Sequence, residues 1–194
     1  MRQKNSQGQT RPADAVRTAS ASTRRMVRIA MIAALYAAIT FVTFFLSFGA
    51  VQYRVCEVLT LLPVFTGSAI PGLTLGCAVA NLVGFFTGVN PIGWIDAIVG
   101  SSATLFAAFS TRWIGRHSRG WVRYVFAPLP PVLFNAVIVG LELTLLFPTQ
   151  ALVLNGFWMY AASVAVGQAV VCYALGVPLM LVLARRDFYK RIFR

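Results

Sequence analysis

Four ionisable side chains lie inside otherwise apolar segments of the sequence: Arg54, Glu57, Asp96 and Glu142. Burying such a side chain in a bilayer costs about 3 kcal/mol on insertion scales, so these residues normally face a cavity or one another. Three carboxylates against one guanidinium leave an excess of hydrogen-bond acceptors, which suits a ligand that is cationic or rich in donors. The four residues therefore predict a polar ligand pocket inside an apolar protein.

Four amide side chains extend this polar set: Gln52, Asn81, Asn135 and Gln168. A structural alternative is that Arg54 pairs with Glu57, because a separation of three residues places both on one face of a helix. That pairing leaves Asp96 and Glu142 without a basic partner. A ligand pocket on the outer side of the membrane is therefore the favoured interpretation of the polar residues.

The composition is that of a protein embedded in a membrane. Of the 194 residues, 58% are hydrophobic and 11% are charged, whereas a soluble domain carries about 25% charged residues. Long apolar stretches such as 29–47 and 125–147 approach the roughly 20 residues that cross a bilayer as a helix. We therefore expect an integral membrane protein.

The net charge of +12 is concentrated in three clusters. Seven of the 17 basic residues lie in 1–28, four in 112–123 and five in 185–194, and Arg54 is the remaining one. Basic clusters that flank apolar segments follow the positive-inside rule. The basic charge therefore indicates topology and contact with anionic lipid, rather than binding of nucleic acid.

The basic clusters also suggest how the chain is divided. Residues 1–28 are polar and lack apolar periodicity, so they predict a disordered basic cytoplasmic tail. They do not have the form of a cleaved signal peptide, which has a shorter charged lead and a small-residue cleavage site. Residues 29–184 are expected to form the membrane domain, and 185–194 a second basic cytoplasmic tail.

With all three basic clusters on the cytoplasmic side, the chain must cross the membrane an even number of times between residues 29 and 111. Breaks that contain glycine or proline divide this stretch into 29–48, 56–66, 71–87 and 93–111. The second segment is short and is expected to be tilted or only partly spanning. Segments 124–147 and 155–184 follow the basic loop. We therefore expect an all-α bundle of six transmembrane helices with both termini cytoplasmic.

Small residues recur at helical spacing in three of these segments. The stripes are Ala30, Ala34 and Ala38, with Ala33 and Ala37 beside them; Gly72, Gly76, Ala80 and Gly84; and Ala161, Ala165 and Ala169. Small side chains let helix backbones approach closely in lipid. Packing within the bundle and docking of a partner subunit both remain open for each stripe. The first helix is the better candidate for docking, because its opposite positions, Leu35 and Ile39 among them, are bulky.

Nothing in the sequence is arranged for catalysis or for holding a metal or cofactor. The three cysteines, Cys56, Cys77 and Cys172, lie far apart in apolar segments and are expected to be small core residues. The single histidine, His117, lies in a basic loop without metal-ligating neighbours. No phosphate-binding loop of the GxxxxGK[ST] kind occurs, so any ATP use must come from another chain. We expect a protein that is not an enzyme.

Four stretches carry a resemblance to a known family: VQYRVCEVLTLLPVF (51–65), AIPGLTLGCAVANL (69–82), GWIDAIVGSSATLFAA (93–108) and LPPVLFNAVIVGLEL (129–143). Over about residues 29–184 the chain resembles the QueT family of membrane proteins. These proteins look like substrate-binding (S) components of energy-coupling factor (ECF) transporters, associated with uptake of queuosine precursors.

The resemblance implies a six-helix S component of a prokaryotic plasma membrane that binds its ligand near the outer face. It implies docking through the alanine-rich face of the first helix onto an EcfT-like coupling subunit, which two cytoplasmic ATPases drive. The docking residues it implies are Ala30, Ala33, Ala34, Ala37 and Ala38. The substrate-binding residues it implies are Gln52, Arg54, Glu57, Asn81, Asp96, Asn135 and Glu142, with Gln168 where the family tends to have a glutamate after a glycine. This departure leaves open which heterocycle is bound: queuine, one of its precursors or another ring.

Two other functions remain as alternatives. A stand-alone secondary transporter or channel predicts an ionisable relay through the full membrane depth or a pair of broken helices. The sequence shows neither clearly. The prolines of PLPP (128–131) disturb the start of one helix, but no matching segment exists in the other half of the chain. A membrane enzyme needs a nucleophile with a base or a metal cluster. An S component for another vitamin-like heterocycle is the nearest variant of the favoured function.

Overall fold

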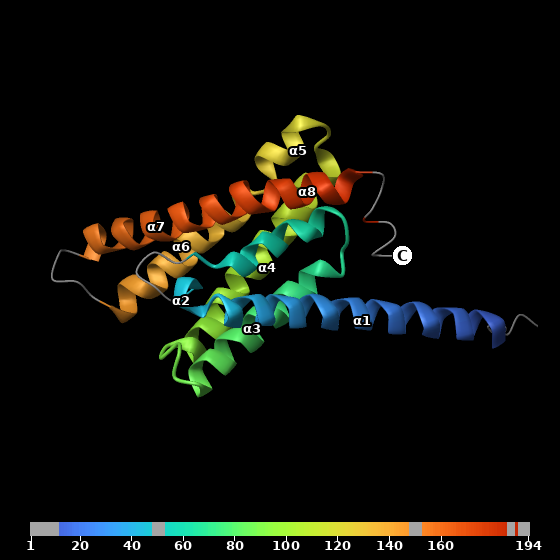
Figure 1. Ribbon diagram of the computed structural model, residues 1–194, viewed down its shortest axis with the longest axis horizontal. Helices are drawn as coiled ribbons and strands as arrows, with labels where there is room; N and C mark the ends of the chain where they lie inside the picture. The colour runs from blue at the N-terminus through green and yellow to red at the C-terminus, as the bar shows by residue number, and fades with distance from the viewer. Residues whose placement is uncertain (1–11, 48–52, 148–152, 186–188, 190–194) are drawn as a thin grey trace, which may run out of the picture.

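The chain folds into a bundle of helices, shown in Figure 1. The computed structural model describes residues 12–47, 53–147, 153–185 and 189. Every regular element in this part of the chain is a helix. The elements are α1 (Pro12–Val42), α2 (Phe44–Ser47), η1 (Val55–Val64), α3 (Ala69–Phe86), α4 (Gly93–His117), α5 (Trp121–Phe126), α6 (Leu129–Leu146), α7 (Val153–Ala169), η2 (Val170–Gly176) and α8 (Val177–Ala184). A helical element lies at each of the six predicted segments.

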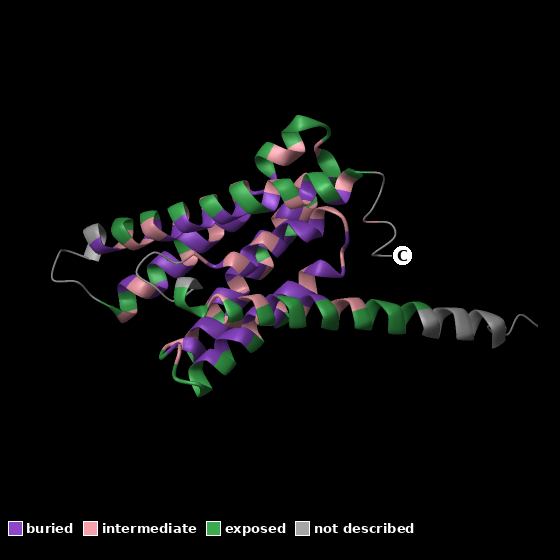
Figure 2. Ribbon diagram, in the orientation of Figure 1, coloured by how far each residue is buried: buried purple, intermediate pink, exposed green. Residues whose placement is uncertain are grey.

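Four helical stretches are long and apolar enough to cross a membrane: Ala21–Val42, Ala69–Phe86, Trp121–Leu146 and Gly156–Ala184. Large apolar side chains on these stretches face outward, with Val42 76%, Phe86 81% and Leu145 68% exposed. Figure 2 shows this exposed surface along the outer sides of α1 and α7. Apolar surface of this extent marks contact with lipid. The protein is a membrane protein, and crossing by η1 and α4 as well stays a prediction.

The second predicted segment, η1, is a 3₁₀-helix of ten residues rather than an α-helix. At about 2 Å of rise per residue it covers about 20 Å, which is less than the roughly 30 Å of a hydrocarbon core. Pro63 lies inside it, and Arg112 on α4 donates a hydrogen bond to the Pro63 carbonyl at 2.8 Å. The length matches the expectation of a segment that spans only part of the bilayer.

Helix α4 is central to the bundle, because it packs against α3, α6 and η1. Apart from Asp96, its buried positions are small: Gly93, Ala97, Gly100, Ser101, Ala103, Thr104, Ala107, Ala108, Thr111 and Gly115. A Cβ atom at Gly115 would lie 2.9 Å from the Cα of Val64 on η1. The Thr104 hydroxyl donates to the Gly100 carbonyl at 2.9 Å, so this helical threonine is satisfied locally. Small side chains therefore let three neighbours reach α4 at once.

The glycine stripe of α3 packs against α1. A Cβ atom at Gly76 would lie 2.8 Å from the Cβ of Tyr36, and one at Gly72 would lie 2.9 Å from another α1 side chain. Likewise, a Cβ atom at Gly140 of α6 would lie 2.9 Å from the Cα of Ala161 on α7. The small residues at these positions therefore serve close packing inside the bundle.

The two alanine stripes of α1 face in different directions. Ala33 and Ala37 are half-buried, and the Ala33 carbonyl lies where a side chain at Gly76 would meet it, at 2.9 Å. Ala30, Ala34 and Ala38 are exposed. Of the two stripes, the one formed by Ala30, Ala34 and Ala38 is therefore the one that lies on the surface of the described bundle.

Helix α1 begins at Pro12, earlier than the predicted membrane-domain boundary at residue 29. The helix therefore extends into residues 12–28, and the division of the chain into tails and a membrane domain stays a prediction. The physical reason is local: the stretch holds alanine and arginine, which favour helix, and proline is well suited to the first helical position. Residues 1–11 of the predicted tail lie outside the described residues.

Apart from Arg54, the basic residues that the structure describes belong to elements whose ends lie on one side of the bundle. In Figure 1 the start of α1, the connection between α4 and α5 and the end of α8 lie toward the right, whereas the turn between α3 and α4 and the end of α6 lie toward the left. The prolines at 128–131 separate α5 from α6, with two prolines in the first turn of α6. Segregation of basic residues to one end is what the positive-inside rule requires.

Substituting Gly76 by alanine tests the α1–α3 contact. The added methyl group would lie within 3.0 Å of Tyr36 and of the Ala33 backbone, so the helices must move apart. We expect a loss of about 1–3 kcal/mol in the free energy of unfolding, which is typical of overpacking, measured as a lower thermal midpoint in detergent. The control Gly67→Ala places its methyl group 3.7 Å from the Arg112 guanidinium, an ordinary contact. Equal midpoints for Gly76→Ala and the unaltered protein would contradict the close packing.

Candidate functional site

Arg54 and Asp96 form a buried ion pair, with 3.3 Å between Nη2 and Oδ2. Arg54 immediately precedes η1 and is 5% exposed, and Asp96 lies in the first turn of α4 and is 2% exposed. The Asn90 side chain donates to the same Asp96 oxygen at 2.8 Å, and the Asn81 side chain donates to the Asp96 carbonyl at 3.2 Å. Asp96, in the first turn of α4, is therefore held by side chains from α3 and from the turn that follows α3, as well as by Arg54.

This geometry corrects the alternative in which Arg54 pairs with Glu57. The backbone of Arg54 has φ −73° and ψ 87°, which is not helical. The rule that residues three apart share a helical face therefore does not apply to it. Within the described part of the chain, the ion pair of Arg54 is made with Asp96, 42 residues away.

Glu57 is fixed from the opposite side by α1. The Tyr36 hydroxyl donates to Oε1 of Glu57 at 2.7 Å, and both side chains are 1% exposed. The Thr60 hydroxyl donates to the Glu57 backbone carbonyl at 2.5 Å. Asn135 on α6 lies beside the Glu57 carboxylate. Glu57 thus joins η1 to α1 and approaches α6.

Glu142 approaches the ion pair from α6. It lies one turn before the end of that helix, is 5% exposed, and is close enough to interact with Asp96 and Arg54. Neither of its carboxylate oxygens has a hydrogen-bond partner in the described structure. Glu142 is therefore a buried carboxylate without a donor.

Unpaired polar atoms converge on this region. The buried side-chain atoms that lack a hydrogen-bond partner among the described residues are Arg54 Nε, Glu57 Oε2, Asp96 Oδ1, Asn135 Nδ2, Glu142 Oε1 and Glu142 Oε2. Buried polar atoms are normally paired, and each unpaired one costs about 1–3 kcal/mol. All of them belong to residues singled out from the sequence. Both donors and acceptors are present, so the group is suited to a polar ligand that carries both.

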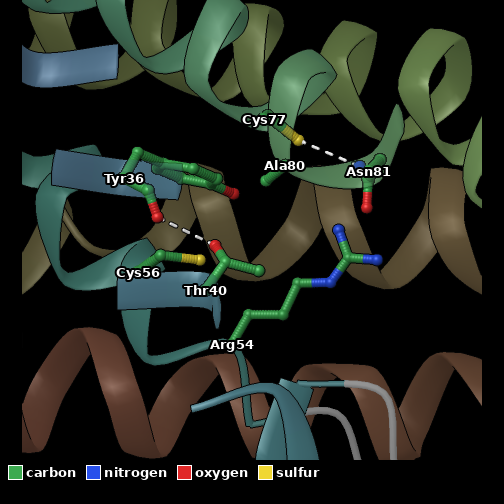
Figure 3. A pocket seen from close by; sticks show the side chains of 7 residues that line it. All are labelled: Tyr36, Thr40, Arg54, Cys56, Cys77, Ala80 and Asn81. Carbon is green, nitrogen blue, oxygen red and sulfur yellow. Dashed lines mark hydrogen bonds between the residues drawn. The ribbon is translucent and has the colours of Figure 1, made fainter. Parts of the chain in front are cut away.

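The side chains of this region are packed against one another. Figure 3 shows the narrow space beside Arg54, where the guanidinium extends toward Asn81 and Tyr36 lies across from it. The side chains that line the space are Tyr36, Thr40, Arg54, Cys56, Cys77, Ala80 and Asn81, and it is too narrow to admit a water molecule. A heterocyclic ligand could therefore enter this space only by displacing the side chains that line it.

The amides and thiols of the predicted set are placed as follows. Gln168 on α7 is 1% exposed, and the Cys172 thiol lies 3.9 Å from its Oε1 and also 3.9 Å from the Glu57 carbonyl. Cys172 lies in the π-helix η2, a geometry often found near functional sites. Gln52 lies outside the described residues. Cys56, Cys77 and Cys172 are free and buried, which confirms them as core residues.

Within the described residues there is no group of three or more His, Cys, Asp or Glu side chains that could hold a metal ion. The three carboxylates instead contact an arginine, a tyrosine and asparagines.

Sequence reasoning missed two residues of the site, Tyr36 and Asn90. Tyr36 carries a phenolic hydroxyl inside an alanine-rich apolar segment, and a polar atom in that position was the available signal. Asn90 lies in the turn GVNPIG, where asparagine is common for conformational reasons alone. Its contact with Asp96 could be found only from the folded chain.

Removing the Arg54 charge tests the ion pair. Arg54→Met leaves Asp96 buried with a charge but without its cation, so we expect the free energy of unfolding to fall by about 3–5 kcal/mol. The measurement is the thermal or denaturant midpoint in detergent. Arg54→Met combined with Asp96→Asn removes both charges and should recover part of the loss. Additive effects of the two substitutions would show that the pair does not interact.

Comparison with known proteins places the chain in a family. The sequence profile of a family described as the QueT transporter matches residues 26–185. The protein named Queuosine precursor transporter QueT from Lactococcus lactis subsp. cremoris (strain MG1363) is 35% identical over 82 residues. That match covers 41% of this chain and 44% of the relative, so it spans less than half of that protein. No solved structure matches the chain.

The family match covers the regions that carry the polar cluster. It extends from the middle of α1 to the residue after α8, and so includes Arg54, Glu57, Asp96, Asn135 and Glu142. The resemblance inferred from the motifs is confirmed. A family of transporters also agrees with the four helical stretches that are long and apolar enough to cross a membrane. This chain belongs to the QueT transporter family.

Proposed function

We propose that this protein is the substrate-binding component of an ECF-type importer and that it takes up a queuosine precursor, a 7-deazaguanine such as queuine or one of its precursors. The observation that carries the proposal is the convergence of unpaired, buried donors and acceptors at one end of the bundle. Membership of a transporter family supports transport, and the name of the Lactococcus lactis relative supports the substrate class.

The chemistry of a 7-deazaguanine complements the unpaired atoms. Its ring N–H and exocyclic amine are adjacent donors, and a carboxylate accepts such a pair in a bidentate manner. Glu57 and Glu142 each offer unpaired carboxylate oxygen. The ring carbonyl is an acceptor, and Arg54 Nε and Asn135 Nδ2 are unpaired donors. A ligand with donors or acceptors alone would leave part of this set unsatisfied.

The position of the site supports binding from outside the cell. The positive-inside rule places the basic end of the bundle in the cytoplasm. In Figure 1 the turn between α3 and α4 and the end of α6, near which Asp96 and Glu142 lie, are at the opposite end. The protein would then be a multi-pass, six-helix protein of a prokaryotic plasma membrane with both termini cytoplasmic. The basic ends would contact anionic lipid.

An exposed groove supports docking of a coupling subunit. It has a volume of about 600 Å³ and runs between α1, η1 and α8. Ala34 and Ala38 line it, and Leu59, Leu62 and Leu183 are among its apolar residues. Small residues beside an apolar groove allow another transmembrane helix to approach closely. An EcfT-like subunit would occupy this face, and two cytoplasmic ATPases bound to that subunit would supply the energy.

Ligand binding is the first test. The purified chain in detergent is titrated with queuine, its 7-deazaguanine precursors, guanine and several vitamins, with calorimetry or tryptophan fluorescence as the readout. We expect a deazaguanine to bind most tightly. Glu57→Ala and Glu142→Ala should each weaken its binding by about 10- to 100-fold, because hydrogen bonds to charged groups are worth about 1.5–3 kcal/mol.

Each other outcome of the titration has a defined meaning. Binding of an unrelated vitamin alone would retain the importer class and overturn the queuosine-precursor substrate. Absence of binding by every compound would contradict a solitary binding component and favour a structural role for the buried charges.

Docking is tested by enlarging the exposed alanine stripe. Ala34→Leu should reduce co-purification with the coupling subunit and its ATPases, because a bulky side chain prevents close approach of helices. Ligand binding by the isolated chain should remain. The matched control is Ala162→Leu, an exposed alanine on α7. Equal co-purification of Ala34→Leu and the unaltered protein would place the docking surface elsewhere.

A further inference from the structure

Two of the buried carboxylates of the site are each held by one oxygen only. The Tyr36 hydroxyl donates to Oε1 of Glu57 at 2.7 Å, whereas Oε2 has no partner among the described residues. Asp96 shows the same pattern: Arg54 and Asn90 both donate to Oδ2, and Oδ1 has no partner there. In both side chains, one oxygen is bound to the protein and the other is left for a further donor.

Tyr36 is held in place by close packing of α1. The side chain is 1% exposed, and a Cβ atom at Gly76 on α3 would lie 2.8 Å from the Tyr36 Cβ. The Thr40 hydroxyl donates to the Tyr36 backbone carbonyl at 2.9 Å, and Cys56 and Cys77 line the narrow space that Tyr36 also lines. A side chain locked by packing fixes the direction of its hydroxyl, and it thereby orients the carboxylate that accepts from that hydroxyl.

The orientation of Glu57 depends on this donor. Asn135 lies beside the carboxylate, but its Nδ2 has no partner in the described structure. Without the Tyr36 hydroxyl, the carboxylate could turn about its last side-chain bond, because that torsion has broad minima. Glu57 is 1% exposed, so water does not replace the hydroxyl. Tyr36 therefore decides which oxygen of Glu57 stays free.

We propose that Tyr36 is a positioning residue of the ligand site: its hydroxyl holds Oε1 of Glu57 and thereby presents Oε2 to a donor on the ligand. This inference rests on the proposed function and adds to it a residue that acts through Glu57 rather than by touching the ligand. The ligand then meets an acceptor of fixed direction, with the unpaired Nδ2 of Asn135 beside it. A side chain that is ordered before binding does not have to be ordered at the expense of affinity.

Removing the hydroxyl alone tests this role. Tyr36→Phe keeps the ring that packs against α3, and the full chain in detergent or lipid nanodiscs is titrated by calorimetry with queuine and with 7-aminomethyl-7-deazaguanine. We expect the tighter ligand to bind about three- to tenfold more weakly, because ordering one mobile side chain costs about that much affinity. The matched control is Tyr173→Phe, which removes a hydroxyl that donates to the Val125 carbonyl at 2.8 Å on α5. It should bind the ligand as the unaltered protein does.

A double-mutant cycle shows whether the effect passes through Glu57. Tyr36→Phe is combined with Glu57→Ala, which removes the carboxylate. In that background we expect Tyr36→Phe to change the affinity less than about twofold, whereas a role in packing alone would weaken binding by the same factor in both backgrounds. Glu57→Gln serves as the background where Glu57→Ala binds too weakly to titrate. Thermal midpoints establish that each variant is folded.

The outcomes separate this inference from the proposed function. Weaker binding by Tyr36→Phe that disappears once Glu57 is substituted supports the inference. Unchanged or tighter binding by Tyr36→Phe, or an equal loss in both backgrounds, overturns it, while the proposed importer stands because the unaltered protein still binds. Binding of neither ligand by the unaltered protein overturns both.

Discussion

The buried ion pair between Arg54 and Asp96 is the interaction on which the polar site depends. Removing two charges from water costs several kcal/mol for each ion, and only good geometry with further hydrogen bonds compensates for it. The pair ties the chain before η1 to the first turn of α4, and Asn90 and Asn81 hold Asp96 in place. Because Arg54 is fixed there, η1 begins in the interior of the bundle. The next carboxylate along the chain, that of Glu57, is therefore buried rather than at the surface.

Small side chains make this arrangement possible. Helix α4 is lined with alanine, glycine, serine and threonine, and the glycines of α3 allow α1 to approach. As a result, α1 presents two different surfaces. Its inner face carries Tyr36, which donates to Glu57, and its outer face carries Ala34 and Ala38 beside an apolar groove. The candidate ligand site and the candidate docking surface therefore lie on opposite faces of one helix.

Family membership and site geometry contribute different information about function. The family establishes a transporter. The unpaired atoms comprise donors on Arg54 and Asn135 and acceptors on the three carboxylates, which suits a polar ligand that carries both kinds of group.

The sequence by itself determined the class of the protein and its helical segments, and it predicted the polar residues of the candidate site. It could do so because a charge in an apolar segment is costly, and because the breaks between the apolar segments contain glycine or proline. Only the tertiary structure decided which residues meet. Arg54 pairs with Asp96 instead of Glu57 because its backbone is not helical. Tyr36 joins the site from α1, and Asn90 joins it from the turn before α4. Local periodicity fixes the faces of a helix, whereas contacts between helices depend on how those faces pack.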